Sequence, residues 1–324
     1  MSFNDPGEGK GAADGREIGG PLFIMGATGS GKSELAVALA ERLGAEIVNA
    51  DAFQVYRGLE TLTAAPSARA RSQVPHHLYG VVDASDSFSA ARFARLAREA
   101  LAGIAARGKL GIVVGGSGLY LKSLTHRLTD LPSDEALREV LRAQPLHEKV
   151  ARLRALDPVG AATMNLSNPR YVERALEISL LSGQPASELK TQWASVDSQN
   201  LRGVLVSWPR DLLYARINQR IERMFALESD AEACSPIVEV TKIEASYGFS
   251  ATAEKALGVR QIRRHLAGEL DPEELIADLQ QATRHYAKRQ ITWFRRENWL
   301  KSVCLDPTTT PESAASEVLG LFNL

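Results

Sequence analysis

The chain has 324 residues, which is enough for about two domains and a sizeable hydrophobic core. Its 38 Lys and Arg residues are balanced by 39 Asp and Glu residues, so a global positive field is excluded and any nucleic-acid surface must be local. No window approaches about 18 uninterrupted apolar residues, which excludes a membrane span. The cysteines, Cys234 and Cys304, lack metal-ligand spacing and predict reduced thiols in the cytoplasm.

The chain begins with a tail, followed by a strand, a turn and a helix. Residues 1–20 are rich in glycine and carry no apolar segment, which predicts a disordered tail. The apolar run Leu22–Met25 predicts a strand, and after a glycine turn the leucines within residues 35–43 have helical spacing. The segment Ala45–Asp51 then predicts a second strand that ends in a carboxylate.

A longer helix and a third strand continue the same alternation. The helix is expected at about Ala90–Arg107, and the almost purely apolar strand Leu110–Val114 follows it and ends in a glycine turn. Strands that alternate with helices predict an α/β fold, in which helices cover both faces of a parallel sheet.

The second half of the chain starts with a different pattern. Over residues 129–200 short helical segments are separated by Pro and Gly, which predicts an inserted helical subdomain. The β-like run Gly203–Trp208 resumes the sheet, and further helices are expected at about Asp211–Phe225 and Asp271–Phe294.

These elements divide the chain into four parts. The predicted parts are the tail 1–20, a core formed by 21–128 and 201–310, the inserted subdomain 129–200, and a C-terminal tail helix over 311–324. Residues 231–252 have weak periodicity and receive no secondary-structure assignment.

A phosphate-binding motif lies between the first predicted strand and helix. The pattern G-x-x-x-x-G-K-[ST] is matched in full by Gly26, Ala27, Thr28, Gly29, Ser30, Gly31, Lys32 and Ser33. Glycines let successive backbone N–H groups converge on phosphate oxygens, and the helix N-terminus adds positive potential. Lys32 would neutralise phosphate charge, and the Ser33 hydroxyl would hold Mg²⁺.

Two polar residues at other strand ends are candidates for the same site. Asp51 follows the second strand, and ligands of open α/β sheets collect outside the carboxyl ends of the strands. It would bind metal, act as a base, or serve only as a cap or turn residue. Ser117 stands in the second glycine turn, where its hydroxyl would face the phosphates or cap a helix.

The strongest local charge lies near the C-terminus. One acid, Glu297, is outnumbered there by Arg284, Lys288, Arg289, Arg295, Arg296 and Lys301. On one helix Arg284, Lys288 and Arg295 share a face, and the interleaved aromatic residues pack inward or stack. Two interpretations stay open at this point: a solvated basic face, or a surface for polyphosphate or nucleic acid.

Together these motifs resemble the tRNA dimethylallyltransferase family. The segments that carry the resemblance, in order over about residues 21–300, are GATGSGKS (26–33), NADAFQVYRG (49–58), PHHLYG (75–80), VVGGSGLYLKSL (113–124), NPRYVERALE (168–177), LYARINQRIERM (213–224) and ATRHYAKRQITWFRRE (282–297). The last segment is the most specific, because a phosphate loop alone is common to many unrelated enzymes.

The resemblance implies a P-loop NTPase-like core and a specific reaction. A dimethylallyl group would pass from its diphosphate to N6 of the adenine just 3′ of the anticodon, in tRNAs that read codons beginning with U. The phosphate loop would hold the diphosphate with Mg²⁺ as cofactor, and Lys32 with Arg216 or Arg220 would contact it. Asp51 would be the base at N6, and Ser117 stands where the family usually has Thr.

The resemblance also implies a tRNA surface. Residues expected to face tRNA are Asp51, Ala52, Phe53, Gln54, Ser117, Arg138, Arg170, Arg174, Lys288, Arg289, Gln290, Thr292, Trp293 and Arg295. The inserted subdomain would grip the anticodon arm, and we expect a cytoplasmic monomer. The chain departs from the family at Ala52, where Ser is usual, at Ala65, where a basic residue is usual, and in the segments 225–230 and 258–261.

Two rival functions use the same phosphate loop. A small-molecule or nucleotide kinase predicts ATP turnover and gives no reason for the basic surface near the C-terminus. A nucleotide-dependent RNA-binding module without chemistry predicts tRNA binding in which Asp51 is dispensable.

Overall fold

The central sheet of this protein is parallel. A computed structural model describes residues 20–126, 131–191, 201–226 and 235–324, so nearly all of the predicted tail 1–20 lies outside it. The described residues form a six-stranded sheet in the order β3-β2-β4-β1-β5-β6. Its strands are β1 (Leu22–Gly26), β2 (Glu46–Asn49), β3 (His76–His77), β4 (Gly111–Gly115), β5 (Arg202–Ser207) and β6 (Lys301–Cys304).

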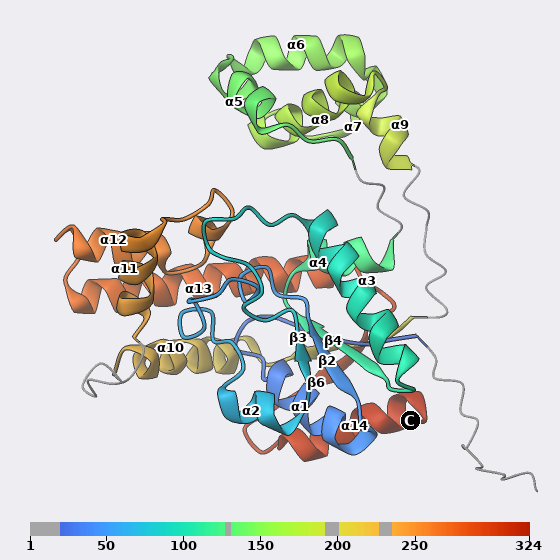
Figure 1. The fold of residues 1–324 in the computed structure, drawn as a ribbon, viewed down its shortest axis with the longest axis vertical. Coiled ribbons are helices and arrows are strands. Elements are labelled where there is room, and N and C mark those ends of the chain that lie inside the picture. The colour runs from blue at the N-terminus through green and yellow to red at the C-terminus, as the bar shows by residue number, and fades with distance from the viewer. Residues whose placement is uncertain (1–19, 127–130, 192–200, 227–234) are drawn as a thin grey trace, which may run out of the picture.

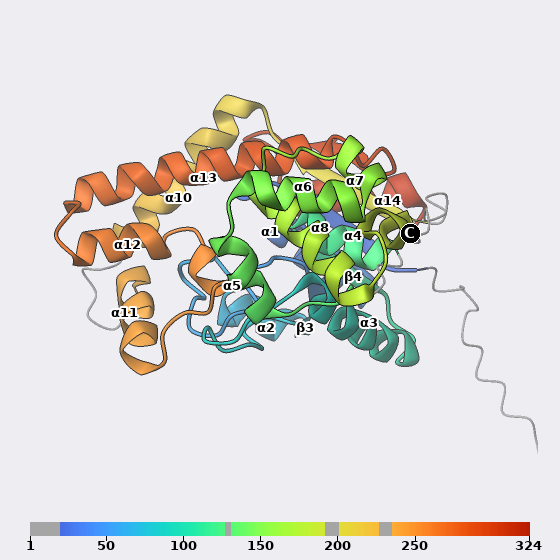
Figure 2. The same ribbon diagram turned by 90° about the horizontal axis from the view of Figure 1, so that it is seen from above.

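Helices cover both faces of this sheet, as the alternating pattern predicts. Side chains alternate along β1, so that Leu22 and Ile24 join one apolar core while Phe23 and Met25 join the other. The first core is closed by α1 (Lys32–Leu43) and α14 (Pro311–Phe322). The second is closed by α3 (Ala90–Ala106), α4 (Gly118–Thr125), α10 (Arg210–Ala226) and α13 (Pro272–Phe294). Figure 2 shows α13 running along the molecule beside α10. The predicted α/β fold is confirmed.

The C-terminal helix α14 belongs to the core and is not a separate tail. Its residues Ala314, Ala315 and Val318 are buried against the first face of the sheet. The helix packs on α1, where Arg42 donates a hydrogen bond of 2.7 Å to Ser316. The predicted C-terminal helix over 311–324 is present as α14, and its small buried side chains let it lie close to α1.

Shorter helices complete the core. They are α2 (Ala68–Gln73), α11 (Pro236–Ser246), the 3₁₀ turn η3 (Ala253–Lys255) and α12 (Val259–Leu266). Helix α11 lies in the segment that received no assignment from sequence. Its apolar pattern is interrupted by Glu239, a carboxylate that is buried and only 2% exposed.

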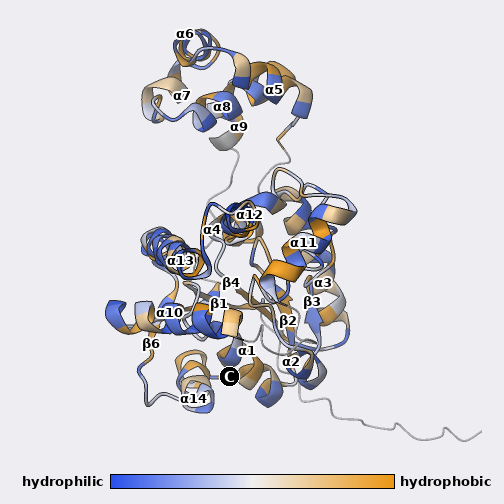
Figure 3. Cartoon of the chain, turned by 90° about the vertical axis from the view of Figure 1, so that its left-hand side faces the viewer, coloured by the Kyte–Doolittle hydropathy of each residue, from blue (hydrophilic) through white to orange (hydrophobic). Residues whose placement is uncertain are grey.

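The inserted segment forms a helical unit with its own core. The helices are α5 (Glu135–Ala143), α6 (Leu146–Leu156), α7 (Pro158–Thr163), α8 (Pro169–Ser182) and α9 (Ala186–Thr191). Buried residues such as Leu153 and Leu176 pack among these helices. The unit lies apart from the sheet in Figure 1 and Figure 3. Across the described residues, no helix has the length and apolar character needed to cross a membrane.

Candidate active site

The phosphate motif connects β1 to α1, in the order of strand, turn and helix that it requires. Gly29 and Gly31 have φ angles of 80° and 82°, a left-handed conformation that glycine adopts without strain. Gly31 is the N-cap of α1, and Ser33 lies in its first turn. Unpaired N–H groups at a helix N-terminus favour a bound anion, so the local geometry fits a phosphate.

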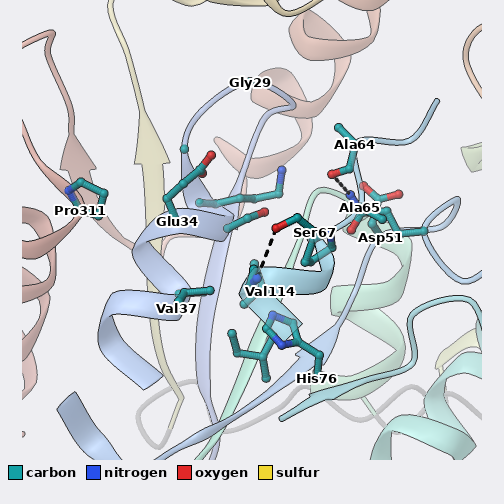
Figure 4. A pocket seen from close by; sticks show the side chains of 18 of the residues that line it. Gly29, Glu34, Val37, Asp51, Ala64, Ala65, Ser67, His76, Val114 and Pro311 are labelled. Atoms are coloured by element: carbon teal, nitrogen blue, oxygen red, sulfur yellow. Dashed lines mark hydrogen bonds between the residues drawn. The ribbon is translucent and has the colours of Figure 1, made fainter. Parts of the chain in front are cut away.

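A cavity of about 600 Å³ opens beside the phosphate loop. Figure 4 shows Asp51 and Ala64 on one side of it, with Glu34 and Val37 of α1 on the other. Basic and polar residues that also line it are Lys32, Ser33, Gln54, Arg216, Gln219, Arg220 and Arg223. The cavity therefore brings together the phosphate loop, the predicted base and both predicted arginines.

The two arginines lie on successive turns of α10 and bind the loop directly. Arg220 donates a hydrogen bond of 2.9 Å to the hydroxyl of Thr28. Arg216 donates one of 3.1 Å to the carbonyl of Gly29, and its guanidinium lies 4.3 Å from the centre of the Trp208 ring. The Nε of Arg220 is buried and has no partner among the described residues. This donor is available to a ligand.

Burial makes the positive charges of the cavity costly without an anion. Desolvation lowers the pKa of Lys32; Asp51 opposes this shift and Arg220 adds to it. Desolvation also lowers the pKa of Arg220, again opposed by Asp51. A bound diphosphate would stabilise the charged forms of both side chains.

Asp51 lies just past the carboxyl end of β2, in a loop with its own hydrogen bonds. The strand ends at Asn49 rather than at Asp51, because the Asn49 side chain accepts a bond of 2.8 Å from the Asp51 N–H and donates one of 2.9 Å to the carbonyl of Leu78. One carboxylate oxygen of Asp51 accepts a bond of 2.9 Å from the N–H of Phe53. The turn thus fixes a half-buried carboxylate opposite the phosphate loop.

A second, smaller cavity of about 50 Å³ adjoins the first and shares Thr28, Asp51, Thr63 and Arg220 with it. Its other walls are mainly apolar and come from Phe53, Leu62, Ile221, Met224, Phe225, Leu257, Leu279, Thr283 and Tyr286. Burial raises the pKa of Tyr286, and Asp51 adds to that shift, so the phenol stays protonated. Sequence reasoning missed this pocket, although its α10 and α13 residues recur at helical spacing.

The residues after Asp51 are partly internal. Ala52 and Phe53 are half-buried against the second core. The amide of Gln54, predicted to face tRNA, donates bonds of 3.0 and 3.1 Å to the carbonyls of Thr63 and Ala64. Gln54 therefore holds a loop that lines the cavity.

The same loop is held from its other side by Glu239, which sequence reasoning missed. Its carboxylate accepts bonds of 2.7 and 2.9 Å from the N–H groups of Thr61 and Leu62. Because Glu239 lies in a helix without clear periodicity, no local pattern could identify it.

Ser117 lies beside the Asp51 loop rather than in either cavity wall. Its N–H donates a bond of 3.3 Å to the carbonyl of Ala50, and it is the N-cap of α4 with no capping bond from its hydroxyl. A Cβ on Gly115 would lie 2.1 Å from that same carbonyl oxygen. Ser117 is not among the described residues that line the two cavities.

Helix α13 presents most of its predicted tRNA residues on the surface. A shallow groove of about 490 Å³ is lined by His285, Lys288, Arg289, Thr292, Trp293 and Arg296. Gln290 points the other way and is 5% exposed. The helix ends at Phe294, as predicted, so the placement of Arg295 and Arg296 on it is wrong: they lie in the turn that leads to β6, which pairs with β5. Arg295 is exposed just past the helix end, and Lys301 lies in β6.

The arginines of the inserted unit have different surroundings. Arg138 and Arg174 both pair with Glu177, at 2.9 and 2.5 Å, and the side chain of Glu177 is 1% exposed. Arg174 also donates to the carbonyl of Pro132 at 2.9 Å. Arg170 is exposed in the first turn of α8. Two of the three predicted tRNA contacts are therefore engaged within the unit.

Comparisons with known proteins agree with one another. The sequence model of the family described as IPP transferase matches residues 54–297, and that described as isopentenyl transferase matches residues 21–79. The tRNA dimethylallyltransferase of Akkermansia muciniphila is 44% identical over 300 residues, which cover 92% of this chain and 98% of the relative. That of Geobacter metallireducens is 41% identical over 312 residues, covering 93% and 97%.

Solved structures of transferases of this kind also resemble this chain. The tRNA isopentenylpyrophosphate transferase of Bacillus halodurans is 32% identical, with a TM-score of 0.63 over 93% of this chain and 96% of that one. A eukaryotic dimethylallyltransferase acting on tRNA has a TM-score of 0.80 over 94% of this chain and 79% of that one. At 24% identity this second likeness concerns the fold alone.

Proposed function

The chain belongs to the IPP transferase family, and on that premise we propose that it transfers a dimethylallyl group from dimethylallyl diphosphate to tRNA, at N6 of the adenine just 3′ of the anticodon in tRNAs that read codons beginning with U. The observation that carries the proposal is that the phosphate loop and Asp51 line the same cavity. Because tRNA is the acceptor we infer a cytoplasmic location, and because one chain supplies both cavities we infer that a monomer acts.

The donor side of the reaction uses the cations of the cavity. As the C–O bond of the allylic diphosphate breaks, positive charge spreads over the allyl group and negative charge grows on the diphosphate. Lys32, the loop N–H groups and the free Nε of Arg220 would stabilise that negative charge without reorganising. Arg216, whose guanidinium lies over the Trp208 ring, would also stabilise the negative charge of the diphosphate.

The acceptor side uses Asp51. An exocyclic adenine amine is a weak nucleophile, because its lone pair is delocalised into the ring. Asp51 would orient this amine toward the allyl carbon and take its proton as the N–C bond forms. The target base must leave its stack to reach the carboxylate, which is easier in an anticodon loop than in a duplex.

The small apolar cavity supports a prenyl donor over a nucleotide donor. A dimethylallyl group is apolar and small, and Met224, Phe225 and Leu279 surround a space next to Asp51 and Arg220. Burial of such a group is favourable by roughly 0.8 kcal/mol per CH₂. The transferred group would lie between the diphosphate site and the base.

Mg²⁺ is proposed as the cofactor, with Ser33 as its protein ligand. Ser33 lines the cavity together with Asp51, and Mg²⁺ prefers oxygen ligands, keeps several waters and binds substrate phosphates. This donor set fits the ion. When bound, Mg²⁺ would neutralise charge on the diphosphate.

The tRNA would lie over the groove of α13. Lys288 and Arg289 supply charge for backbone phosphates, and Trp293 supplies a ring on which a base can stack. Arg170 and the exposed face of the inserted unit would contact the anticodon arm. Arg138 and Arg174 are proposed to support this contact indirectly, by holding the start of the unit onto α8.

The test is incorporation of label from radiolabelled dimethylallyl diphosphate into unmodified tRNA, with ATP in a parallel tube. Label in tRNA supports the proposal, ATP turnover supports the kinase, and tRNA binding without either supports the RNA-binding module. The decisive variant is Asp51→Asn, which keeps the shape but cannot take a proton. We expect transfer to slow by at least about 10² in single turnover, with no rescue by added Mg²⁺.

The matched control is the exposed Asp83→Asn, which should transfer at the parent rate. Both variants should unfold within about 1 kcal/mol of the parent. A near-parent rate for Asp51→Asn would remove its catalytic role, and rescue by Mg²⁺ would make it a metal ligand.

A further inference from the structure

Gln290 joins two loops that are far apart in the sequence. Its amide oxygen accepts a hydrogen bond of 2.8 Å from the N–H of Thr28, in the phosphate loop. Its amide nitrogen donates a bond of 2.9 Å to the carbonyl of Gly116, in the turn after β4. The side chain is 5% exposed; its bond to Gly116 is buried, and its bond from Thr28 is partly buried.

The turn after β4 is shaped to receive this side chain. A Cβ on Gly116 would lie 2.2 Å from the Gln290 amide nitrogen, and one on Gly118 would lie 2.1 Å from the ring of Trp293. Gln290 and Trp293 lie three residues apart on α13, and each contacts one glycine of this turn. Glycine at these two positions therefore lets the helix approach the backbone closely.

The two bonds of Gln290 belong to a chain that links all three active-site loops. Thr28 is held by Gln290 through its N–H and by Arg220 through its hydroxyl. On the other side of Gly116, the N–H of Ser117 bonds to the carbonyl of Ala50, directly before Asp51. The phosphate loop and the Asp51 loop are thus connected through Gln290 and the glycine turn.

We propose that Gln290 is a positioning residue for the donor, which sets the phosphate loop against the Asp51 loop, and is not a tRNA contact. This proposal rests on the proposed function and replaces the sequence-based placement of Gln290 on the tRNA surface. Its neighbours Lys288 and Arg289 differ from it, since both are exposed in the groove. A preorganised site loses rate steeply when its parts shift, by about 10²-fold for roughly 1 Å.

The test uses two Gln290 variants and one control on the full chain. Gln290→Met has a similar length and makes neither bond, while Gln290→Glu keeps an acceptor for Thr28 but cannot donate to Gly116. The control, Arg289→Ala, lies on the exposed face of the same helix. For each protein we would measure the single-turnover rate against donor concentration at saturating tRNA, the tRNA affinity without donor, and the affinity for inorganic pyrophosphate without tRNA.

Gln290→Met is expected to lower the ratio of the single-turnover rate to the KM for the donor by about 10- to 100-fold. Its affinity for pyrophosphate should fall by a similar factor. Its tRNA affinity should stay within about twofold of the parent. Gln290→Glu should lose pyrophosphate affinity at least as strongly, because its charge repels the anion. Arg289→Ala should instead weaken tRNA binding and leave the donor and pyrophosphate parameters at the parent values.

The proposal is overturned if the Gln290 variants weaken tRNA binding while donor and pyrophosphate parameters stay at parent values, or if they change nothing. The pyrophosphate measurement needs no transfer to tRNA, so it tests the role of Gln290 separately from the proposed function. If the parent protein transfers no label to tRNA, the proposed function fails, and the pyrophosphate affinities still decide the role of Gln290.

Discussion

Replacing Glu46 by Gln is expected to destabilise the sheet at the strand that leads to Asp51. Glu46 begins β2, and its side chain is 4% exposed. Its carboxylate accepts bonds from Arg107 at 2.6 and 3.1 Å and from His77 at 2.8 Å, and Lys109 lies at 3.2 Å. These partners fasten β3 and the end of α3 to the amino end of β2.

The size of the effect follows from the ionisation of this carboxyl. The hydrogen bond from Arg107 is the largest influence, and with those from His77 and Lys109 it outweighs burial and lowers the pKa of Glu46 from 4.5 to about 2. That difference corresponds to roughly 3 kcal/mol of stability at neutral pH, as an upper bound because the cations are partly exposed. Since the folded-state pKa is depressed, the contribution is present above pH 4.5 and is lost as the pH falls from there toward 2.

Urea unfolding of the parent and Glu46→Gln over a pH series measures this contribution. We expect the variant to be less stable by about 2 to 3 kcal/mol at pH 7, with a deficit that shrinks below about pH 4.5. The control is Asp83→Asn, which removes an exposed pair with Arg57 and should change stability by less than about 1 kcal/mol. A deficit that is independent of pH, or no larger than that of the control, would refute the reasoning.

The remaining predictions concern the substrates. Lys32→Ala should slow transfer at saturating donor by about 10² to 10³ with tRNA affinity little changed, because Lys32 stabilises charge on the leaving group. Single-turnover rates test this prediction. Turnover at the parent rate would contradict the phosphate-loop assignment. Replacing Lys288 and Arg289 together by Ala should lower the slope of log K against log salt by roughly one to two units, similarly for different tRNAs, because both bind phosphates. Affinities measured between about 50 and 200 mM salt test this, and an unchanged slope would leave a solvated basic face.

The parts of the site that sequence predicts are those whose chemistry is local. The phosphate loop needs only a strand, glycines at two left-handed positions and a helix start, all within residues 22–33. The position of Asp51 is predictable from sequence because a parallel sheet gathers its strand ends at one edge. The cavity that joins them confirms this placement, whereas the catalytic role of Asp51 stays a prediction.

Polar residues with remote partners were harder to place. Gln54 and Gln290 read as surface residues beside basic or loop segments, yet both bind backbone groups inside the protein. Polarity does not tell whether a helical residue is buried when another segment supplies its hydrogen bonds. Glu177 likewise pairs with Arg138 and Arg174, and the local sequence pattern does not indicate that pairing.

The two glycine turns show most clearly where sequence reasoning stops. Both follow an apolar strand and precede a helix, so the sequence predicts a phosphate-binding turn for the first and a phosphate contact or a helix cap for the second. In the first, Gly29 and Gly31 are needed for their positive φ angles. In the second, the described Gly115, Gly116 and Gly118 do not adopt positive φ, and what they supply is space, for Ala50, Gln290 and Trp293 in turn. A glycine required by its own backbone leaves a local signal, whereas a glycine required by a neighbour is explained only when the neighbour is known.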